Sequence, residues 1–255
     1  MSSVRAWSSG LARCVVTRMT RVNRNIRWHE YPDTTQLVEA AVAEISDQAM
    51  RAVAARGVFR VVLAGGTTPR EVYAALAERD LDWQRWHVYF SDERCLPVGH
   101  RDRNDLMAGS ALLDRVAINR SQVFAIPAEL GPHEGARAYR ATLAAVGDFD
   151  LTLLGMGEDG HTASLFPGHP LGAEPNAPCA LAVEDAPKPP AERVTLSAAR
   201  LNRSRAVMTI VTGSGKRDAI RQLHEAVDIP IRSITPAAGM DVFLDSAAAI
   251  PELPR

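Results

Sequence analysis

At residues 151–167 the chain reads Leu-Thr-Leu-Leu-Gly-Met-Gly-Glu-Asp-Gly-His-Thr-Ala-Ser-Leu-Phe-Pro, so an apolar run stops at a glycine-rich turn that carries acids and a histidine. The apolar segment 149–154 is short and is followed by Gly155, a pattern typical of a buried strand in a parallel sheet. In open α/β sheets, ligands bind in the crevice beyond the carboxyl ends of such strands. We therefore expect this turn to border an active site.

The rest of the chain alternates between strand and helix patterns. Further strands are predicted at residues 59–63, 87–90, 123–126, 180–183, 206–211 and 241–244. Helices are predicted from a cap at Asp33 to about residue 55, from Pro69 onward, and near residues 104–114, 133–145 and 215–226. The Pro-rich segment 186–190 is expected to be a loop. This alternation predicts an α/β fold whose mainly parallel, Rossmann-like sheet carries helices on both faces.

Composition favours one globular domain. The chain has 255 residues, 46% of them hydrophobic, and a formal net charge of −1, which gives no general electrostatic case for a nucleic-acid partner. No apolar segment approaches the roughly 20 residues that span a bilayer. Cys14, Cys95 and Cys179 are widely spaced and lack metal-ligand spacing, which indicates reduced thiols. We expect a cytoplasmic protein with neither a nucleic-acid nor a membrane partner.

The N-terminal segment differs from the remainder. Residues 1–27 contain six arginines and no acidic residue. An Arg-rich, Ser-containing leader of this kind is typical of an organellar transit peptide. The alternative is a start upstream of the true initiator, Met19, which leaves a disordered tail. We favour the tail and predict a basic N-terminal extension over residues 1–25, followed by a single α/β domain over residues 26–255.

The three glycines of residues 155–160 match the dinucleotide-binding spacing G-x-G-x-x-G. That motif requires a helix N-terminus aimed at a pyrophosphate, yet this turn carries Glu158 and Asp159, whose charges repel phosphates. Pro167 and Pro170 also interrupt any long helix after the turn. A nicotinamide cofactor is therefore not expected.

Several other loops that follow strands carry groups suited to a phosphorylated sugar. Gly65, Gly66 and Thr67 open a helix, where backbone N–H groups can hold a phosphate, although a tight turn with a helix cap explains the same residues. Lys216 follows a second small-residue turn, and Arg193 has a forked guanidinium that binds phosphate oxygens in pairs. Either cation alone is more often a solvated surface charge.

Two motifs extend this pattern. Asp92 and Arg94 belong to Ser-Asp-Glu-Arg at residues 91–94, which suits sugar hydroxyls or phosphate, although a surface salt-bridge cluster is the alternative. At His161, an imidazole can take a proton from water near neutral pH, although a histidine can also simply pack in such a turn. If these loops converge, they form a pocket for a phosphorylated sugar.

Taken together, these motifs closely resemble the 6-phosphogluconolactonase family. The resemblance covers about residues 26–250, and its most specific elements are Gly-Gly-Thr-Thr-Pro at 65–69 and Asp-Gly-His-Thr-Ala-Ser-Leu-Phe-Pro at 159–167. It implies the fold of glucosamine-6-phosphate deaminase and ribose-5-phosphate isomerase. It also implies hydrolysis of 6-phosphoglucono-1,5-lactone to 6-phosphogluconate in the oxidative pentose phosphate pathway.

The resemblance also implies the roles of individual residues. His161 is the general base that draws a proton from the attacking water, and Asp159 helps to arrange the site. The substrate-binding residues are expected to be Gly65, Gly66, Thr67, Asp92, Arg94, Gly157, Arg193 and Lys216. Neither a metal nor a cofactor is expected, because a lactone is an activated ester. Backbone N–H groups near Gly157 and the Arg94 side chain are the candidates for oxyanion stabilisation. A monomer or weak homodimer is expected.

Two other functions remain open. Glucosamine-6-phosphate deaminase shares the glycine loop and the Asp-Gly-His element, but its motif continues toward Phe-Asn-Glu-Pro. Phe166 stands here in the place of that carboxylate, and phenylalanine cannot move a proton. The second alternative is a non-catalytic sugar-phosphate sensor. Asp159 and His161 argue against a sensor, because binding alone requires no base.

Overall fold

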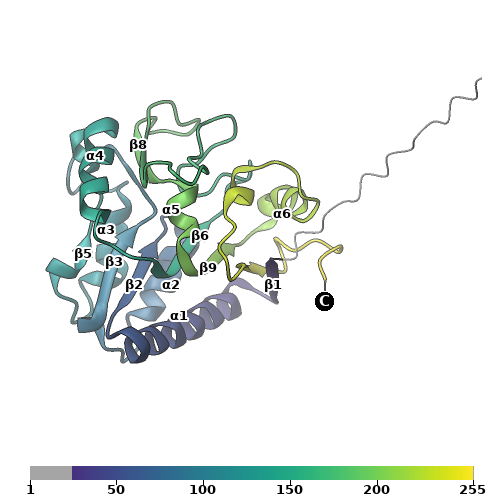
Figure 1. Cartoon of the computed structure of the whole chain (residues 1–255). Helices are drawn as coiled ribbons and strands as arrows, with labels where there is room; N and C mark the ends of the chain where they lie inside the picture. Colours follow the sequence, from purple (N-terminus) through teal and green to yellow (C-terminus); the bar gives the residue numbers. More distant parts are fainter. Residues whose placement is uncertain (1–24, 255) are drawn as a thin grey trace, which may run out of the picture.

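The computed structural model describes residues 25–254 (Figure 1). Apart from Asn25, the predicted N-terminal extension lies outside the described residues. Within them, one seven-stranded sheet has the order β1-β10-β9-β6-β2-β3-β5, and every neighbouring pair is parallel. Its strands are β1 (Ile26–Tyr31), β2 (Phe59–Leu63), β3 (Trp86–Phe90), β5 (Val123–Phe124), β6 (Phe149–Gly155), β9 (Ser204–Val211) and β10 (Met240–Asp245).

The predicted parallel sheet is confirmed, but one predicted strand belongs elsewhere. Residues 180–183 form β7 (Ala180–Val183) of a second, antiparallel sheet with the order β4-β8-β7. Its partners β4 (Asp92–Arg94) and β8 (Arg193–Leu196) were not predicted as strands, and neither was the edge strand β1. The three residues of β4 are all charged, so no apolar pattern marks this strand.

Between residues 25 and 254, six α-helices connect the strands. They are α1 (Thr34–Arg56), α2 (Thr67–Leu76), α3 (Asn104–Ala108), α4 (Pro132–Leu143), α5 (Ala198–Asn202) and α6 (Arg217–His224). Asp33 caps α1 as predicted, since its carboxylate accepts the Gln36 N–H at 2.9 Å. The second helix begins at Thr67, two residues before the predicted start, so Pro69 lies within the first turn.

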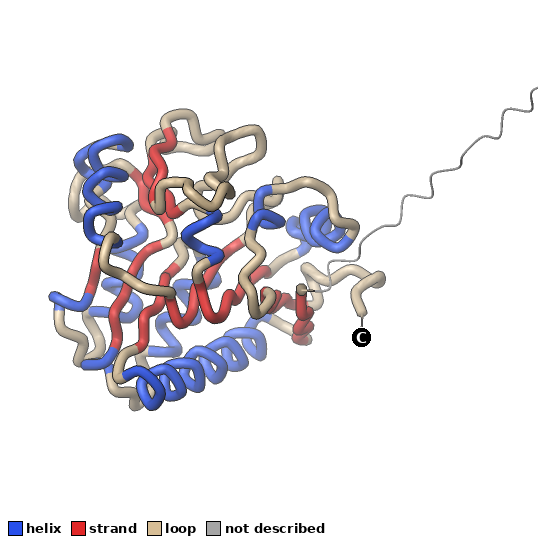
Figure 2. Tube along the Cα trace, in the orientation of Figure 1, coloured by secondary structure: helices blue, strands red, loops and turns tan. Residues whose placement is uncertain are grey.

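The direction of the connections distributes the helices over the two faces of the sheet. The chain moves one way along the sheet through α1, α2 and α3, and the opposite way through α4, α5 and α6. Right-handed crossovers place these two sets on opposite faces, and helices flank both sides of the strands (Figure 2). On the first face, α2 packs against both α1 and α3.

The strand order reverses between β2 and β6. After β2 the chain continues to β3 and β5 on one side, and after β6 it continues to β9 and β10 on the other. Such a reversal opens a crevice at the carboxyl ends of the two central strands. The loops that leave β2 and β6 contain the Gly-Gly-Thr-Thr-Pro and Asp-Gly-His motifs, so the topology brings these two motifs together.

No helix within residues 25–254 combines the length and the apolar character that crossing a membrane requires. The Pro-rich segment 186–190 is a loop, as predicted, and it connects β7 to β8.

Candidate active site

A cavity of about 510 Å³ lies at the carboxyl ends of β2, β3, β6 and β9. Nine of the ten predicted site residues line it: Gly65, Gly66, Thr67, Asp92, Arg94, Gly157, His161, Arg193 and Lys216. The tenth, Asp159, is not part of the cavity wall and contacts His161 instead. The loops therefore converge in one pocket, which sequence reasoning had to assume.

His161 and Asp159 form a dyad at the cavity wall. Nδ1 of the imidazole lies 2.5 Å from Asp159 Oδ1, and the imidazole is 18% exposed. Burial alone raises the pKa of the Asp159 carboxyl, but hydrogen bonds from His161 and the histidine charge outweigh burial and lower this pKa. An ionised Asp159 fixes the proton on Nδ1, which leaves Nε2 as the basic nitrogen.

Gly157 makes room for this dyad. A Cβ atom at this position would lie 2.0 Å from His161 Nδ1 and 2.6 Å from Asp159 Oδ1. The Gly157 N–H donates to the His161 carbonyl at 2.8 Å, which closes the turn. The N–H of Gly157 itself is therefore occupied, so a backbone oxyanion donor in this turn would have to be one of the neighbouring N–H groups.

Phe166 forms the floor beneath His161. The ring is fully buried, and its centroid lies 4.8 Å from that of the imidazole. The Arg193 guanidinium lies on the same ring, 5.4 Å from its centroid. An apolar ring therefore stands where a deaminase-like site would need a carboxylate, and the Phe166 side chain itself cannot relay a proton.

Asp92 connects the segments that surround the cavity through its hydrogen bonds. Its Oδ2 accepts from Ser164 Oγ at 2.7 Å, and its Oδ1 accepts from Ser91 Oγ at 3.0 Å and from Asn104 Nδ2 at 3.3 Å. The side chain is 6% exposed. Since protein donors already occupy both oxygens, Asp92 holds neighbouring groups in place, and the geometry favours this over the predicted direct contact with substrate.

Two arginines lie directly opposite each other on neighbouring strands of the small sheet. Arg94 of β4 is the register partner of Arg193 of β8. Like charges directly opposite on paired strands destabilise a sheet, so their placement beside one cavity favours binding of an anion. Arg193 is nearly buried, and burial together with the Arg94 charge lowers the pKa of its guanidinium, although Asp92 opposes this. The buried Nε of Arg94 has no hydrogen-bond partner among the described residues.

Arg193 also organises the Pro-rich loop. Its Nε donates to the Pro190 carbonyl at 3.1 Å and its Nη2 donates to the Lys188 carbonyl at 2.7 Å. This loop places Lys188 at the cavity, which Lys216 also lines. Burial is the main cause that lowers the pKa of Lys216, and the Lys188 charge adds to it, whereas Glu158 acts in the opposite direction.

The glycine loop after β2 is held from both sides. Tyr73 of α2 clamps it, since Tyr73 Oη donates to the Ala64 carbonyl and accepts the Ala64 N–H, both at 2.9 Å. Thr68 Oγ1 lies 2.7 Å from Thr212 Oγ1, which connects this loop to the turn before Lys216. A backbone fixed in this way presents the first turn of α2 to a bound anion.

Lys188 and Asn104 are two of the polar cavity residues that the sequence analysis does not assign to the site. Lys188 lies in the segment predicted only as a loop, and no strand pattern marks it as part of the site. Asn104 lies at the start of α3 and reaches the cavity because α3 begins next to β4. Within residues 25–254, no group of three or more His, Cys, Asp or Glu side chains is arranged to hold a metal ion.

Comparison with known proteins gives a consistent result. A family described as glucosamine-6-phosphate isomerases/6-phosphogluconolactonase matches residues 32–243. A 6-phosphogluconolactonase from Synechocystis sp. is 35% identical over 230 residues, which cover 83% of this chain and 92% of the relative. The crystal structure of 6-phosphogluconolactonase from Thermotoga maritima superposes with a TM-score of 0.80 at 27% identity, covering 87% of this chain and all of the other.

A monomeric glucosamine-6-phosphate deaminase also superposes, with a TM-score of 0.76 at 19% identity over 87% of this chain and 98% of the other. This likeness concerns the fold alone. The backbone therefore does not separate the two activities, and the side chains around His161 have to.

Proposed function

The chain belongs to the glucosamine-6-phosphate isomerase/6-phosphogluconolactonase family, and we propose how its site hydrolyses 6-phosphoglucono-1,5-lactone to 6-phosphogluconate, a step of the oxidative pentose phosphate pathway. The observation that carries the mechanism is the Asp159–His161 dyad at the wall of a cavity that four cationic side chains approach. A base next to an anion-binding wall is what hydrolysis of a phosphorylated lactone needs.

In the proposed mechanism, His161 Nε2 takes a proton from a water molecule as its oxygen attacks the lactone carbonyl carbon. Asp159 keeps the proton of Nδ1 in place and stabilises the imidazolium that forms. The tetrahedral intermediate collapses with cleavage of the bond to the ring oxygen, which receives the proton from His161. The new carboxylic acid then ionises and releases one proton to solvent.

Arg94 is the proposed oxyanion ligand. Its side chain lines the cavity, whereas the N–H of Gly157 itself, one of the backbone N–H groups considered as alternatives, is already engaged. Arg94 is oriented by a 2.5 Å hydrogen bond from its Nη1 to the Asp102 carbonyl. A fixed donor directed at developing negative charge is the largest single contribution in many acyl-transfer sites.

The substrate phosphate is assigned to Arg193, Lys216, Lys188 and the loop 65–67. Two lysines and a nearly buried arginine at one wall are costly for the free protein, and a bound dianion removes this repulsion.

The deaminase alternative is disfavoured by Phe166, and the sensor alternative by the paired base. The single-domain arrangement over residues 26–255 and a cytoplasmic location remain proposals, the latter supported by the scarcity of cysteines.

The test follows proton release from freshly generated lactone, with the spontaneous rate subtracted. We expect His161→Ala to lower kcat about 10²- to 10⁴-fold, whereas Lys216→Ala mainly raises KM, because base and phosphate ligand act on different steps. His133→Ala is the matched control, because His133 is exposed and lies outside the cavity. A folded wild-type protein that gives no acceleration would refute the lactonase function. Ammonia release from glucosamine 6-phosphate would then favour the deaminase, and binding of a sugar phosphate without hydrolysis would favour the sensor.

A further inference from the structure

We propose that Asn104 determines substrate specificity by accepting a hydrogen bond from one ring hydroxyl of the lactone through its side-chain oxygen, Oδ1. The inference rests on the proposed function and adds to it a residue that reads the sugar, whereas the residues above act on the carbonyl and on the phosphate. Asn104 is 3% exposed and lines the cavity.

The orientation of the Asn104 amide is set by its neighbours. One end of the amide lies 2.9 Å from the Asp92 carbonyl oxygen and 3.3 Å from Asp92 Oδ1. Both of these atoms are acceptors, so this end must be the Nδ2 donor. The other end is therefore Oδ1, which can only accept.

Oδ1 is a buried acceptor that the protein leaves free. It accepts no hydrogen bond from any described residue, yet it is not among the fully enclosed atoms that lack a partner, so it opens onto the cavity. It lies against the Cα atom of Gly65, where a Cβ atom would come within 2.1 Å. An unpaired acceptor that is largely removed from water is costly, and a donor on the ligand satisfies it.

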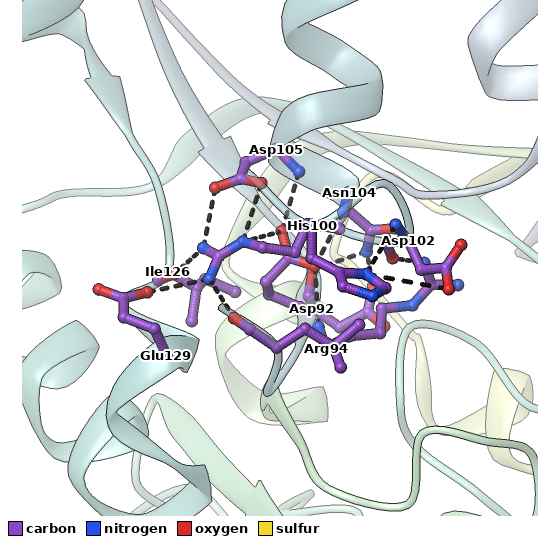
Figure 3. A network of polar contacts seen from close by, with 11 residues as sticks. Asp92, Arg94, His100, Asp102, Asn104, Asp105, Ile126 and Glu129 are labelled. Carbon is purple, nitrogen blue, oxygen red and sulfur yellow. Dashed lines mark hydrogen bonds and ion pairs between the residues drawn. The ribbon is translucent and has the colours of Figure 1, made fainter. Parts of the chain in front are cut away.

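The surrounding network keeps this acceptor in place. The Glu93 carboxylate accepts the N–H groups of Asn104 and Asp105, each at 2.8 Å, which caps the start of α3. Asp92 is fixed in turn by Ser164 at 2.7 Å. Figure 3 shows Asn104 within this network, next to Asp92 and above Arg94. A preorganised acceptor discriminates between ligands better than a mobile one, because it cannot turn to another partner.

A purely structural role for Asn104 makes a different prediction. If Asn104 only supports Asp92 and Gly65, its removal lowers kcat/KM by the same factor for every lactone. If Oδ1 binds a hydroxyl, its removal abolishes the discrimination against the one analogue that lacks this hydroxyl. The two cases differ in the coupling between the enzyme variant and the substrate variant.

The experiment compares the parent lactone with three 6-phosphorylated analogues that lack the hydroxyl at C2, C3 or C4. The kcat/KM values are measured for wild type, Asn104→Ala and Asn104→Ser, and each is normalised to the spontaneous hydrolysis of the same lactone. Asn176→Ala is the matched control, because Asn176 is exposed and lies outside the cavity. Thermal unfolding establishes which variants are folded.

We expect wild type to hydrolyse one analogue about 10- to 100-fold less efficiently than the parent, the loss that an unpaired buried acceptor causes. Both Asn104 variants should show a loss of similar size on the parent and little further loss on that analogue. The inference is overturned if wild type discriminates against none of the three, or if the folded variants reduce all four rates equally. If neither variant folds, a wild-type profile that discriminates against none of the three analogues still overturns the inference. Failure of wild type on the parent lactone itself would refute the proposed function.

Discussion

The close approach of Gly157 to His161 leads to a quantitative prediction for Gly157→Ala. An ordinary contact to a Cβ atom is at least about 3.4 Å, and the added methyl group would lie only 2.0 Å from His161 Nδ1. The imidazole must therefore move by more than an ångström, and it loses its contact with Asp159. A displacement of about 1 Å at a reacting group lowers turnover on the order of 10²-fold. We expect that loss in kcat, with KM nearly unchanged.

The backbone at Gly157 offers no separate explanation for such a loss. Gly157 does not adopt a positive φ, so alanine meets no backbone strain there. Gly147→Ala is the matched control, because Gly147 also lacks a positive φ, has open space around its Cα atom and lies outside the cavity. Gly147→Ala should unfold near the wild-type temperature, since glycine to alanine changes at compatible positions are neutral or slightly stabilising. Gly157→Ala should lose some stability because its methyl group displaces packed neighbours, so thermal unfolding must show that this variant is folded in the assay.

The assay is initial-rate proton release in wild type, Gly157→Ala, His161→Ala and the double variant. If the methyl group acts by displacing His161, it should cause no further loss once the imidazole is absent. Two results would refute this reasoning. One is a folded Gly157→Ala protein with at least half of the wild-type kcat, and the other is a double variant in which the two losses multiply.

Two further predictions concern carboxylates that pair with histidines. Asp159→Asn should lower kcat about 10²- to 10⁴-fold at neutral pH, because an amide donor reverses the imidazole tautomer and places a proton on Nε2; an unchanged kcat in a folded variant contradicts this role. The Pro167 carbonyl, helped by Asp185 and opposed by burial, raises the pKa of His169 above about 6.5. The resulting stabilisation is present below that value and is lost as the pH rises through the folded-state pKa, so His169→Gln should lower the unfolding temperature more at pH 5 than at pH 9. Equal losses at the two pH values would exclude this linkage.

The parallel sheet and most of its elements follow from local patterns. Residues 149–154 are mostly apolar, with Asp150 and Thr152 as the exceptions, because β6 is covered on both faces, and this burial leaves a trace in the sequence. The residues after each strand are also predictable as site residues, since the carboxyl ends of parallel strands share one edge of the sheet. For this reason the sequence predicts Gly65, His161 and Lys216 as site residues.

No comparable local pattern in the sequence marks the small antiparallel sheet. β4 consists of Asp, Glu and Arg, and it is a strand only because β8 pairs with it from about 100 residues further along the chain. The pairing of Arg94 with Arg193 depends on that long-range register. The same applies to the hydrogen bonds of Asp92, because two of its partners, Asn104 and Ser164, come from other segments of the chain.

The sequence by itself therefore determined the α/β class, the strand ends that carry the chemistry, and the histidine and acid of the dyad. These features depend on neighbours close along the chain, whose periodicity and turn chemistry are visible locally. Only the tertiary structure decided which ring nitrogen of His161 is free, that Phe166 lies beneath it, and that the Gly157 N–H and the Asp92 oxygens are already occupied. Those features depend on distances between atoms, and the fold sets such distances through contacts that no local pattern encodes.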